Sequence, residues 1–380
     1  MTRRNFAGSA AAAVVSLADL ASGQPVHSVF AYVGCFTTAK RKGRGDGIHV
    51  YKIDSRTRVW TQTQVLGGLE NPSFLAFGPG GKVLYSSHGD ENYATAYTID
   101  AETGSIAVLN KGATGGTNGA HLAISPNGKF AIVANYTSGT LAVLPVKADG
   151  GLGDFVQLIK LDGAPGPHRV EQPGSHPHQI IFAPGGSFVL IPDKGLDRVF
   201  IFRFNADSGN LTPADPGSIQ TRSGAGPRHL AFHPTLPMVW VLNELGNTVT
   251  TCRWDAAKGT LTVLRTLPTL PEDFTGDSTA AELALSPNAK FLYTSNRGHD
   301  SIAAFAVDPK TGFLRSVGWT PAGGKVPRYI TIEPSGRYLL STNEQSDTIT
   351  RFRIQPANGA LHPEGSPIPN GTPVTVAFRI

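Results

Sequence analysis

The sequence has few cysteines, little charge and no long hydrophobic run. Its 380 residues include two Cys, and only 16% are Asp, Glu, Lys or Arg. Cys35 and Cys252 stand far apart, without a CxxC or a metal-ligand spacing, so neither a disulfide framework nor a zinc site has support. No apolar stretch reaches about 18 residues, which argues against a membrane span. These absences favour a globular protein that does not cross a membrane.

Basic residues are in slight excess, with 33 Lys and Arg against 28 Asp and Glu. They are scattered along the chain, and the single cluster is Lys40 to Arg44. A nucleic-acid-binding protein usually gathers its basic residues on one patch or helix. A nucleic-acid partner is therefore not expected, whereas a small anionic molecule fits a weakly basic protein.

Glycine and proline are abundant, with 44 and 28 copies, and they punctuate a repeated pattern. The repeat contains an apolar strand, a turn with a marker proline, a second apolar strand and usually two more strands. The marker prolines are 47 to 58 residues apart, which is room for four short strands: Pro79, Pro126, Pro184, Pro234, Pro287 and Pro334. Four antiparallel strands repeated radially form a β-propeller. The sequence thus predicts an all-β fold with six complete blades.

The two ends of the repeat region provide half a unit each. Residues 373–378 read as the first strand of a blade, and residues 28–34 read as the second. Pairing them would make a seventh blade shared by the termini and would leave no open sheet edge. We therefore expect a seven-bladed β-propeller over residues 28–380.

The segment before the propeller has the order of an export signal. Arg3 and Arg4 precede a mildly apolar, alanine-rich run from Ala7 to Ala18. Paired arginines before such a run are typical of twin-arginine signals. We expect residues 1–27 to be a signal segment of this type and the protein to be periplasmic or exported; a cytoplasmic protein with an untargeted N-terminus is the alternative.

Polar residues recur where the first two strands of each unit should meet at one channel mouth. The residue just before the first strand and the one just after the second are expected to lie on the same face. The pairs are Pro72 with His88, His121 with Asn135, His178 with Asp193, Arg228 with Glu244, Glu282 with Arg297, and Arg328 with Glu344. Arginine can bind a carboxylate or phosphate and stabilise an oxyanion, and histidine can transfer a proton near neutral pH.

Motifs for other chemistries are missing. The chain has no G-x-S-x-G, H-E-x-x-H, Walker A loop or intact G-x-G-x-x-G. No cofactor and no metal are therefore expected. Acid/base activation of water for attack on an ester fits the set of residues, as does the reverse reaction, a lactonisation.

Several short motifs, in order along the chain, resemble one family. They include Gly226-Pro-Arg-His229, Leu242-Asn-Glu-Leu245, Ser175-His-Pro-His178 and Ser295-Asn-Arg-Gly298. From about Ser28 to Ile380 the chain resembles the seven-bladed β-propeller lactonases of the bacterial 6-phosphogluconolactonase type, a family that includes fungal carboxymuconate lactonising enzymes. The resemblance implies a lactonase that hydrolyses a small anionic sugar lactone without a metal.

The family's active-site residues match His178, Arg228, Glu244 and Arg297. The resemblance implies that His178 or Glu244 is the base and that the two arginines hold the substrate anion and the oxyanion. The further candidates for substrate binding are His121, Asn135, Asp193, His229, Glu282 and Arg328.

Other readings of the same residues stay open. They are a lactonising cycloisomerase, a propeller that only binds a ligand or partner, and a purely structural ion pair between Arg228 and Glu244. The residues leave the oligomeric state open.

Overall fold

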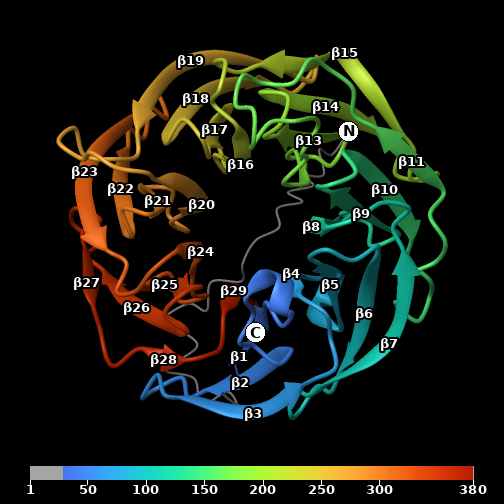
Figure 1. The fold of residues 1–380 in the computed structure, drawn as a ribbon, viewed down its shortest axis with the longest axis vertical. Coiled ribbons are helices and arrows are strands. Elements are labelled where there is room, and N and C mark those ends of the chain that lie inside the picture. The colour runs from blue at the N-terminus through green and yellow to red at the C-terminus, as the bar shows by residue number, and fades with distance from the viewer. Residues whose placement is uncertain (1–28, 380) are drawn as a thin grey trace, which may run out of the picture.

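A computed structural model of the chain describes residues 29–379 and shows seven sheets around a central axis, six of four strands and one of five (Figure 1). Blades 1 to 3 follow the order of the chain: β4 (Pro72–Phe77), β5 (Val83–His88), β6 (Tyr93–Ile99) and β7 (Ile106–Ala113); β8 (Gly119–Ile124), β9 (Phe130–Asn135), β10 (Thr140–Pro145) and β11 (Gln157–Lys160); β12 (Ile181–Phe182), β13 (Phe188–Asp193), β14 (Arg198–Phe204) and β15 (Leu211–Gln220).

Blades 4 to 6 continue the same pattern around the ring: β16 (Pro227–Phe232), β17 (Met238–Asn243), β18 (Thr248–Asp255) and β19 (Thr260–Pro268); β20 (Thr279–Leu285), β21 (Phe291–Arg297), β22 (Ser301–Val307) and β23 (Leu314–Pro321); β24 (Pro327–Ile332), β25 (Tyr338–Asn343), β26 (Thr348–Ile354) and β27 (Leu361–Pro363), with β28 (Ile368–Pro369) also paired to β26. The only helices among the described residues are the short 3₁₀ turns η2 (Ala39–Arg41) and η3 (Pro79–Gly81). None of this part of the chain is a helix able to cross a membrane.

The seventh blade joins the two ends of the described chain. Its strand order is β29 (Pro373–Arg379), β1 (Val29–Cys35), β2 (Ile48–Ile53) and β3 (Trp60–Leu66). β29 and β1 are antiparallel, with Val33 opposite Val376, and β29 takes the innermost place beside β4 and β24 (Figure 1). The predicted propeller and its shared blade are confirmed. The predicted signal segment, residues 1–27, lies outside the described residues.

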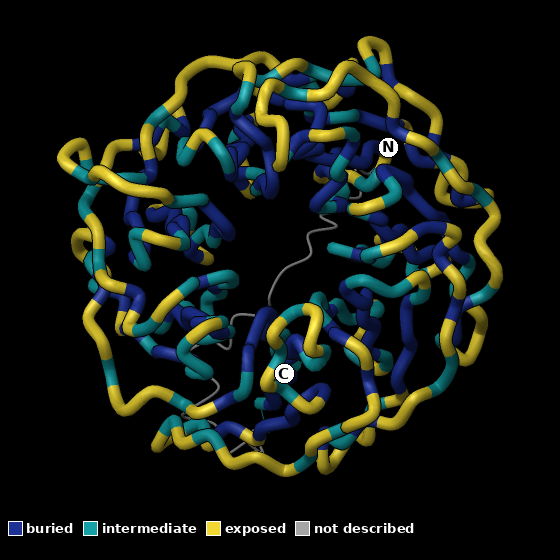
Figure 2. The backbone as a smooth tube through the Cα atoms, viewed as in Figure 1, coloured by how far each residue is buried: buried dark blue, intermediate teal, exposed yellow. Residues whose placement is uncertain are grey.

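The hydrophobic core lies between neighbouring blades. Figure 2 shows buried backbone on the inner strands and exposed backbone mainly on the outer rim. One cluster joins Ile132 and Val143 of blade 2 to Val189 and Phe202 of blade 3, and similar clusters fill the other interfaces. Because each blade covers its apolar faces with its two neighbours, closing the ring leaves none of the sheets uncovered.

A bulge near the channel mouth repeats in the innermost strands. The register of β16 with β17 shifts between Pro227 and His229, so Arg228 is the extra residue, and similar shifts occur in blades 1, 2, 5, 6 and 7. In blade 3, β12 is short and an isolated bridge joins Pro177 to Asp193 ahead of it. Bulges re-aim side chains, and they are common beside active sites. Here the residue six positions before the marker proline comes to the mouth.

Candidate active site

A cavity of about 680 Å³ occupies one mouth of the channel. Arg228, Arg328 and His178 enter it from the position six residues before their marker prolines. Lys194, Glu244 and Arg297 enter from the ends of the returning strands, each ten residues after the marker proline of its own blade. Because these two spacings from the marker proline are the same in each blade that has one, side chains from distant parts of the chain meet around one cavity.

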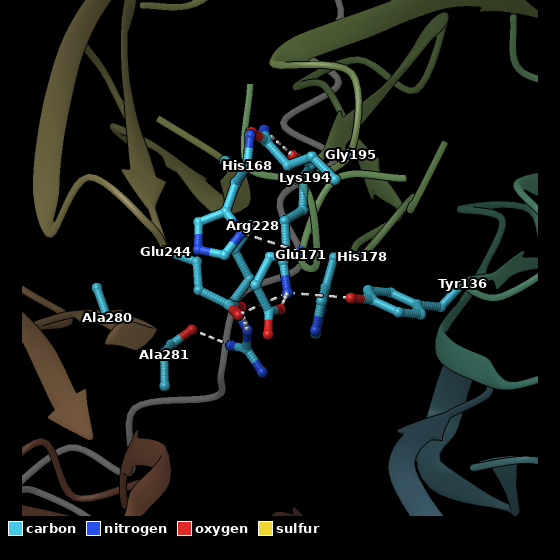
Figure 3. A network of polar contacts seen from close by, with 12 residues as sticks. Tyr136, His168, Glu171, His178, Lys194, Gly195, Arg228, Glu244, Ala280 and Ala281 are labelled. Carbon is cyan, nitrogen blue, oxygen red and sulfur yellow. Dashed lines mark hydrogen bonds and ion pairs between the residues drawn. The ribbon is translucent and has the colours of Figure 1, made fainter. Parts of the chain in front are cut away.

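Glu244 is the centre of a buried cluster of cations (Figure 3). Its Oε2 lies 2.9 Å from Nε of Arg228, and its Oε1 lies 3.0 Å from Nζ of Lys194 and 3.2 Å from a terminal nitrogen of Arg297. Burial opposes the charge of this carboxylate, but Arg297, Lys194 and Arg228 outweigh it and hold the pKa of Glu244 far below its usual range. Glu244 is therefore an acceptor that fixes three cations and a poor general base.

The cations stay charged for complementary reasons. Burial disfavours the ammonium of Lys194, yet Glu244 and the 2.5 Å contact with Glu171 raise the pKa of Lys194. Burial and the neighbouring Arg297 lower the pKa of Arg228, against the attraction of Glu244. Its guanidinium nevertheless remains protonated near neutral pH, because arginine does not lose its proton in proteins. Lys194, Arg228 and Arg297 carry three positive charges against the two carboxylates of Glu244 and Glu171, which leaves positive charge to offer to an anion.

Arg228 is held from two sides. Besides the contact with Glu244, it donates a hydrogen bond to the carbonyl oxygen of Ala281 in the next blade (Figure 3). The side chain is buried and is fixed in direction before any ligand arrives. Such preorganised donors are what stabilises negative charge as it develops in a reaction.

His178 brings a buried imidazole to the cavity. Burial first, and then Arg228, lower the pKa of its imidazole well below the usual value. Its Nδ1 lies 3.1 Å from Nε2 of His229, and the ring of Tyr136 stands edge-on against it. Within residues 29–379, Nε2 of His178 has no hydrogen-bond partner, so this atom faces the cavity without a competitor.

The remaining candidates from the sequence divide into three groups. Arg328 lines the cavity, 3.6 Å from Glu344, and makes no hydrogen bond within the described chain. His229 and Glu282 lie deeper, five residues before their marker prolines, and His121 shares that layer without lining the upper cavity.

Asn135 and Asp193 are absent from the cavity lining, because they stand nine residues after their marker prolines, at the last residue of the strand, whereas Glu244 stands ten residues after its own, just past the strand end. The amide of Asn135 donates to Thr114 and Thr140, and Asp193 accepts from Ser175, His176, Gly195 and Leu196. Both therefore hold the wall together instead of facing a ligand, which corrects their placement at the mouth.

Two cavity residues, Tyr136 and Lys194, were missed by the sequence reasoning. Both stand ten residues after a marker proline, as do Glu244, Arg297 and Glu344. The position before them is Asn in four of the six complete blades: Asn135, Asn243, Asn296 and Asn343. Each of these amides bonds the start of the third strand, which explains the repetition structurally. Counting strictly from the proline would have identified Tyr136 and Lys194.

The family model "Lactonase, 7-bladed beta-propeller" matches residues 30–378. The chain belongs to the seven-bladed β-propeller lactonases. This places it among the carboxylic-ester hydrolases. It is 32% identical over 300 residues to the 6-phosphogluconolactonase of Bacillus subtilis, which covers 78% of this chain and 83% of the relative. It is 31% identical over 312 residues to a 6-phosphogluconolactonase of Formosa agariphila, with 79% and 85% covered.

The architecture agrees with a solved lactonase structure. The periplasmic gluconolactonase of Pseudomonas aeruginosa superposes with a TM-score of 0.86 at 30% identity, covering 92% of this chain and 99% of that one. The predicted family is confirmed, and so is the predicted class of enzyme.

Proposed function

We propose that this lactonase hydrolyses a sugar lactone of the 6-phosphogluconolactone or gluconolactone kind at the cavity that contains His178. The observation that carries the proposal is a neutral, buried imidazole that lines the same cavity as three cations fixed on Glu244. The names of the Bacillus and Pseudomonas relatives supply the two substrate types. A cationic cluster suits a substrate whose product is a carboxylate.

In the proposed reaction, His178 acts as the general base. Water attacks the lactone carbonyl carbon and gives one proton to Nε2 of His178, and the carbonyl oxygen becomes an oxyanion near Arg228 and Arg297. The ring carbon–oxygen bond then breaks, and the ring oxygen takes the proton back from the imidazolium. The hydroxy acid ionises near neutral pH, so each turnover releases one proton.

Glu244 has a different role in this proposal from the base. It lies against three cations and its pKa is depressed, so it holds the arginines in place. Arg328, whose guanidinium lies 3.6 Å from Glu344 and over the ring of Phe36, is the proposed contact for a second polar or anionic group of the sugar. The residues alone supply a base, an oxyanion site and an anchor, and no metal is part of the proposal.

A lactone panel tests the proposed function. Proton release is followed in a pH-stat with gluconolactone, 6-phosphogluconolactone and γ-lactones of comparable size, with and without chelator. The wild type should hydrolyse at least one of the two sugar lactones, unaffected by chelator, and His178→Gln should lose about 10³-fold in kcat. A fully active His178→Gln enzyme would contradict the assignment of the base. Turnover of an unsaturated dicarboxylate such as a carboxymuconate to its isomeric lactone, with no hydrolysis of the sugar lactones, would favour a cycloisomerase instead.

The compartment is a second part of the proposal. We infer export from the paired Arg3 and Arg4, in keeping with a relative described as periplasmic. Expressed in a bacterium, the protein should appear in the periplasm with a mature start after about residue 20, measured as intact mass. Replacing both arginines with lysine should retain it in the cytosol. Full-length protein in the cytosol, with the double variant indistinguishable, would refute export.

A further inference from the structure

Three buried side chains on neighbouring blades line the cavity and contact one another in a row. His178 precedes the innermost strand of blade 3, His229 lies on β16 and Glu282 on β20. Nδ1 of His178 is 3.1 Å from Nε2 of His229, and Nδ1 of His229 is 2.7 Å from Oε1 of Glu282. Their exposed fractions are 7%, 3% and 5%. Both ring nitrogens of His229 are thus occupied by the other two residues.

The chemistry of the end group fixes the direction of each hydrogen bond. An ionised carboxylate can only accept, so Nδ1 of His229 carries a proton and donates it to Glu282. In neutral His229, Nε2 is then an acceptor and must receive the hydrogen from Nδ1 of His178. Neutral His178 is left with its lone pair on Nε2, the atom toward the cavity.

We propose that His229 and Glu282 are positioning residues that select the tautomer of His178 and stabilise its protonated form. The proposal rests on the proposed function, in which Nε2 of His178 takes a proton from water. When that proton arrives, His178 becomes an imidazolium whose Nδ1–H still donates to His229, and the Glu282 carboxylate lies at the far end of the chain. No further bond is made or broken.

The alternative role, direct substrate binding by His229 and Glu282, fits the geometry less well. A second cavity of about 730 Å³ lies on the other side of these residues, and His229 and Glu282 line both cavities. They therefore form part of the floor between the two. The equivalent position of the other six blades holds Phe74, His121, Gln179, His229, Tyr329 and Thr375. Glu282 is therefore the one carboxylate at this position of the seven blades.

Charges around the three residues set the expected sign of a pH effect. Arg228, His229, Arg328 and Lys194 all disfavour a proton on His178, beyond the effect of burial. Around His229, burial and Arg228 disfavour the charge, whereas Glu282 and Glu244 favour it. His121 packs edge-on against His229, and Tyr329 lies near Glu282. Removing the Glu282 charge should therefore make His178 a weaker base.

The principal experiment compares the pH dependence of kcat/KM for the wild type and Glu282→Gln. The glutamine can still accept from His229, so the ring orientation is kept while the negative charge is lost. We expect kcat/KM to fall roughly 10- to 100-fold and the acid limb to move about 0.5 to 1 pH unit lower. Glu333→Gln is the matched control, because Glu333 is a buried carboxylate of the second cavity that contacts Ser335 and Arg58 instead. Its profile should equal that of the wild type.

Two further measurements separate positioning from folding. His229→Gln retains an acceptor for His178 and should keep more activity than His229→Leu, at equal melting temperatures. Nitrogen-15 NMR of the wild type should show His178 protonated on Nδ1 and bare on Nε2, a result that does not depend on any substrate.

Each contrary outcome points to a different error. An unshifted acid limb in Glu282→Gln, or His178 protonated on Nε2, would overturn the positioning role of His229 and Glu282 while leaving the lactonase proposal intact. A wild type that hydrolyses no lactone, but has the expected tautomer, would overturn the proposed function. The hydrogen bonds of His229 and Glu282 would then have no role in catalysis.

Discussion

The two arcs of the channel mouth have the same backbone and very different side chains. In blades 3, 4 and 6 the mouth position of the innermost strand holds His178, Arg228 and Arg328, and blade 5 contributes Arg297 from its returning strand. In blades 7, 1 and 2 the equivalent position of the innermost strand holds Val374, Ser73 and Ala120. We call these the charged arc and the plain arc.

This contrast separates what the repeat does from what the site does. Strand register and the bulges are common to both arcs, so they set where a side chain will be placed. The residue type at that position then decides whether the place carries chemistry. A propeller can therefore support many functions without changing its backbone, and fold alone does not locate the site.

The largest expected effect comes from the plain arc, through the fold. Deleting residues 373–380 removes β29, which pairs with β1 and buries Val374 and Val376. The loss exposes strand edges in blade 7, and we expect aggregation or loss of cooperative unfolding, measured by calorimetry and light scattering. A monomeric truncation with an unchanged melting temperature would show that the shared blade is dispensable.

A smaller effect is expected at the centre of the charged arc. Glu244→Gln leaves Lys194, Arg228 and Arg297 without their common carboxylate, which should cost about 3 kcal/mol of unfolding free energy at pH 7. The pKa of Glu244 is lower in the folded than in the unfolded protein, so its stabilisation is complete above its unfolded value of about 4.3 and is lost as the pH falls further.

Urea unfolding at pH 7 and at about pH 3.5 measures this difference. The gap between wild type and Glu244→Gln should be largest at pH 7 and smaller at the acidic value. Glu364→Gln, which loses an exposed pair with Arg353, provides the control and should change stability by less than about 1 kcal/mol. A gap that widens on acidification would mean that Glu244 is not the ionised anchor described above.

Most of the fold could be predicted from the sequence because the repeat has a rigid marker. The six prolines and the apolar strands around them predict the blades, and the half units at the ends predict the closing blade. The further strands that the repeat usually contains are present in the structure, for example the third strand of blade 5, Ser301–Val307. These features follow from a local pattern that occurs six times along the chain.

The site was predicted less completely, for a reason of register. Some of the expected pairs took the residue nine positions after the marker proline and others the residue ten positions after it. Asn135 and Asp193 were therefore placed at the mouth in place of Tyr136 and Lys194. A bulge or a one-residue slip turns a side chain to the other side of the sheet. The hydrogen bonds of His229 to both His178 and Glu282 join three blades, and no local sequence pattern predicts such contacts.

The most direct test of the two arcs is kcat/KM on the best sugar lactone for Arg228→Ala and Ser73→Ala, which alter the same strand position in opposite arcs. Arg228→Ala should lose about 100-fold, or about 3 kcal/mol of transition-state stabilisation, and Arg228→Lys should recover only part, because an ammonium lacks the planar donor fork. Ser73→Ala should match the wild type. A stable, fully active Arg228→Ala enzyme would contradict the account, because the chemistry would then lie outside the charged arc.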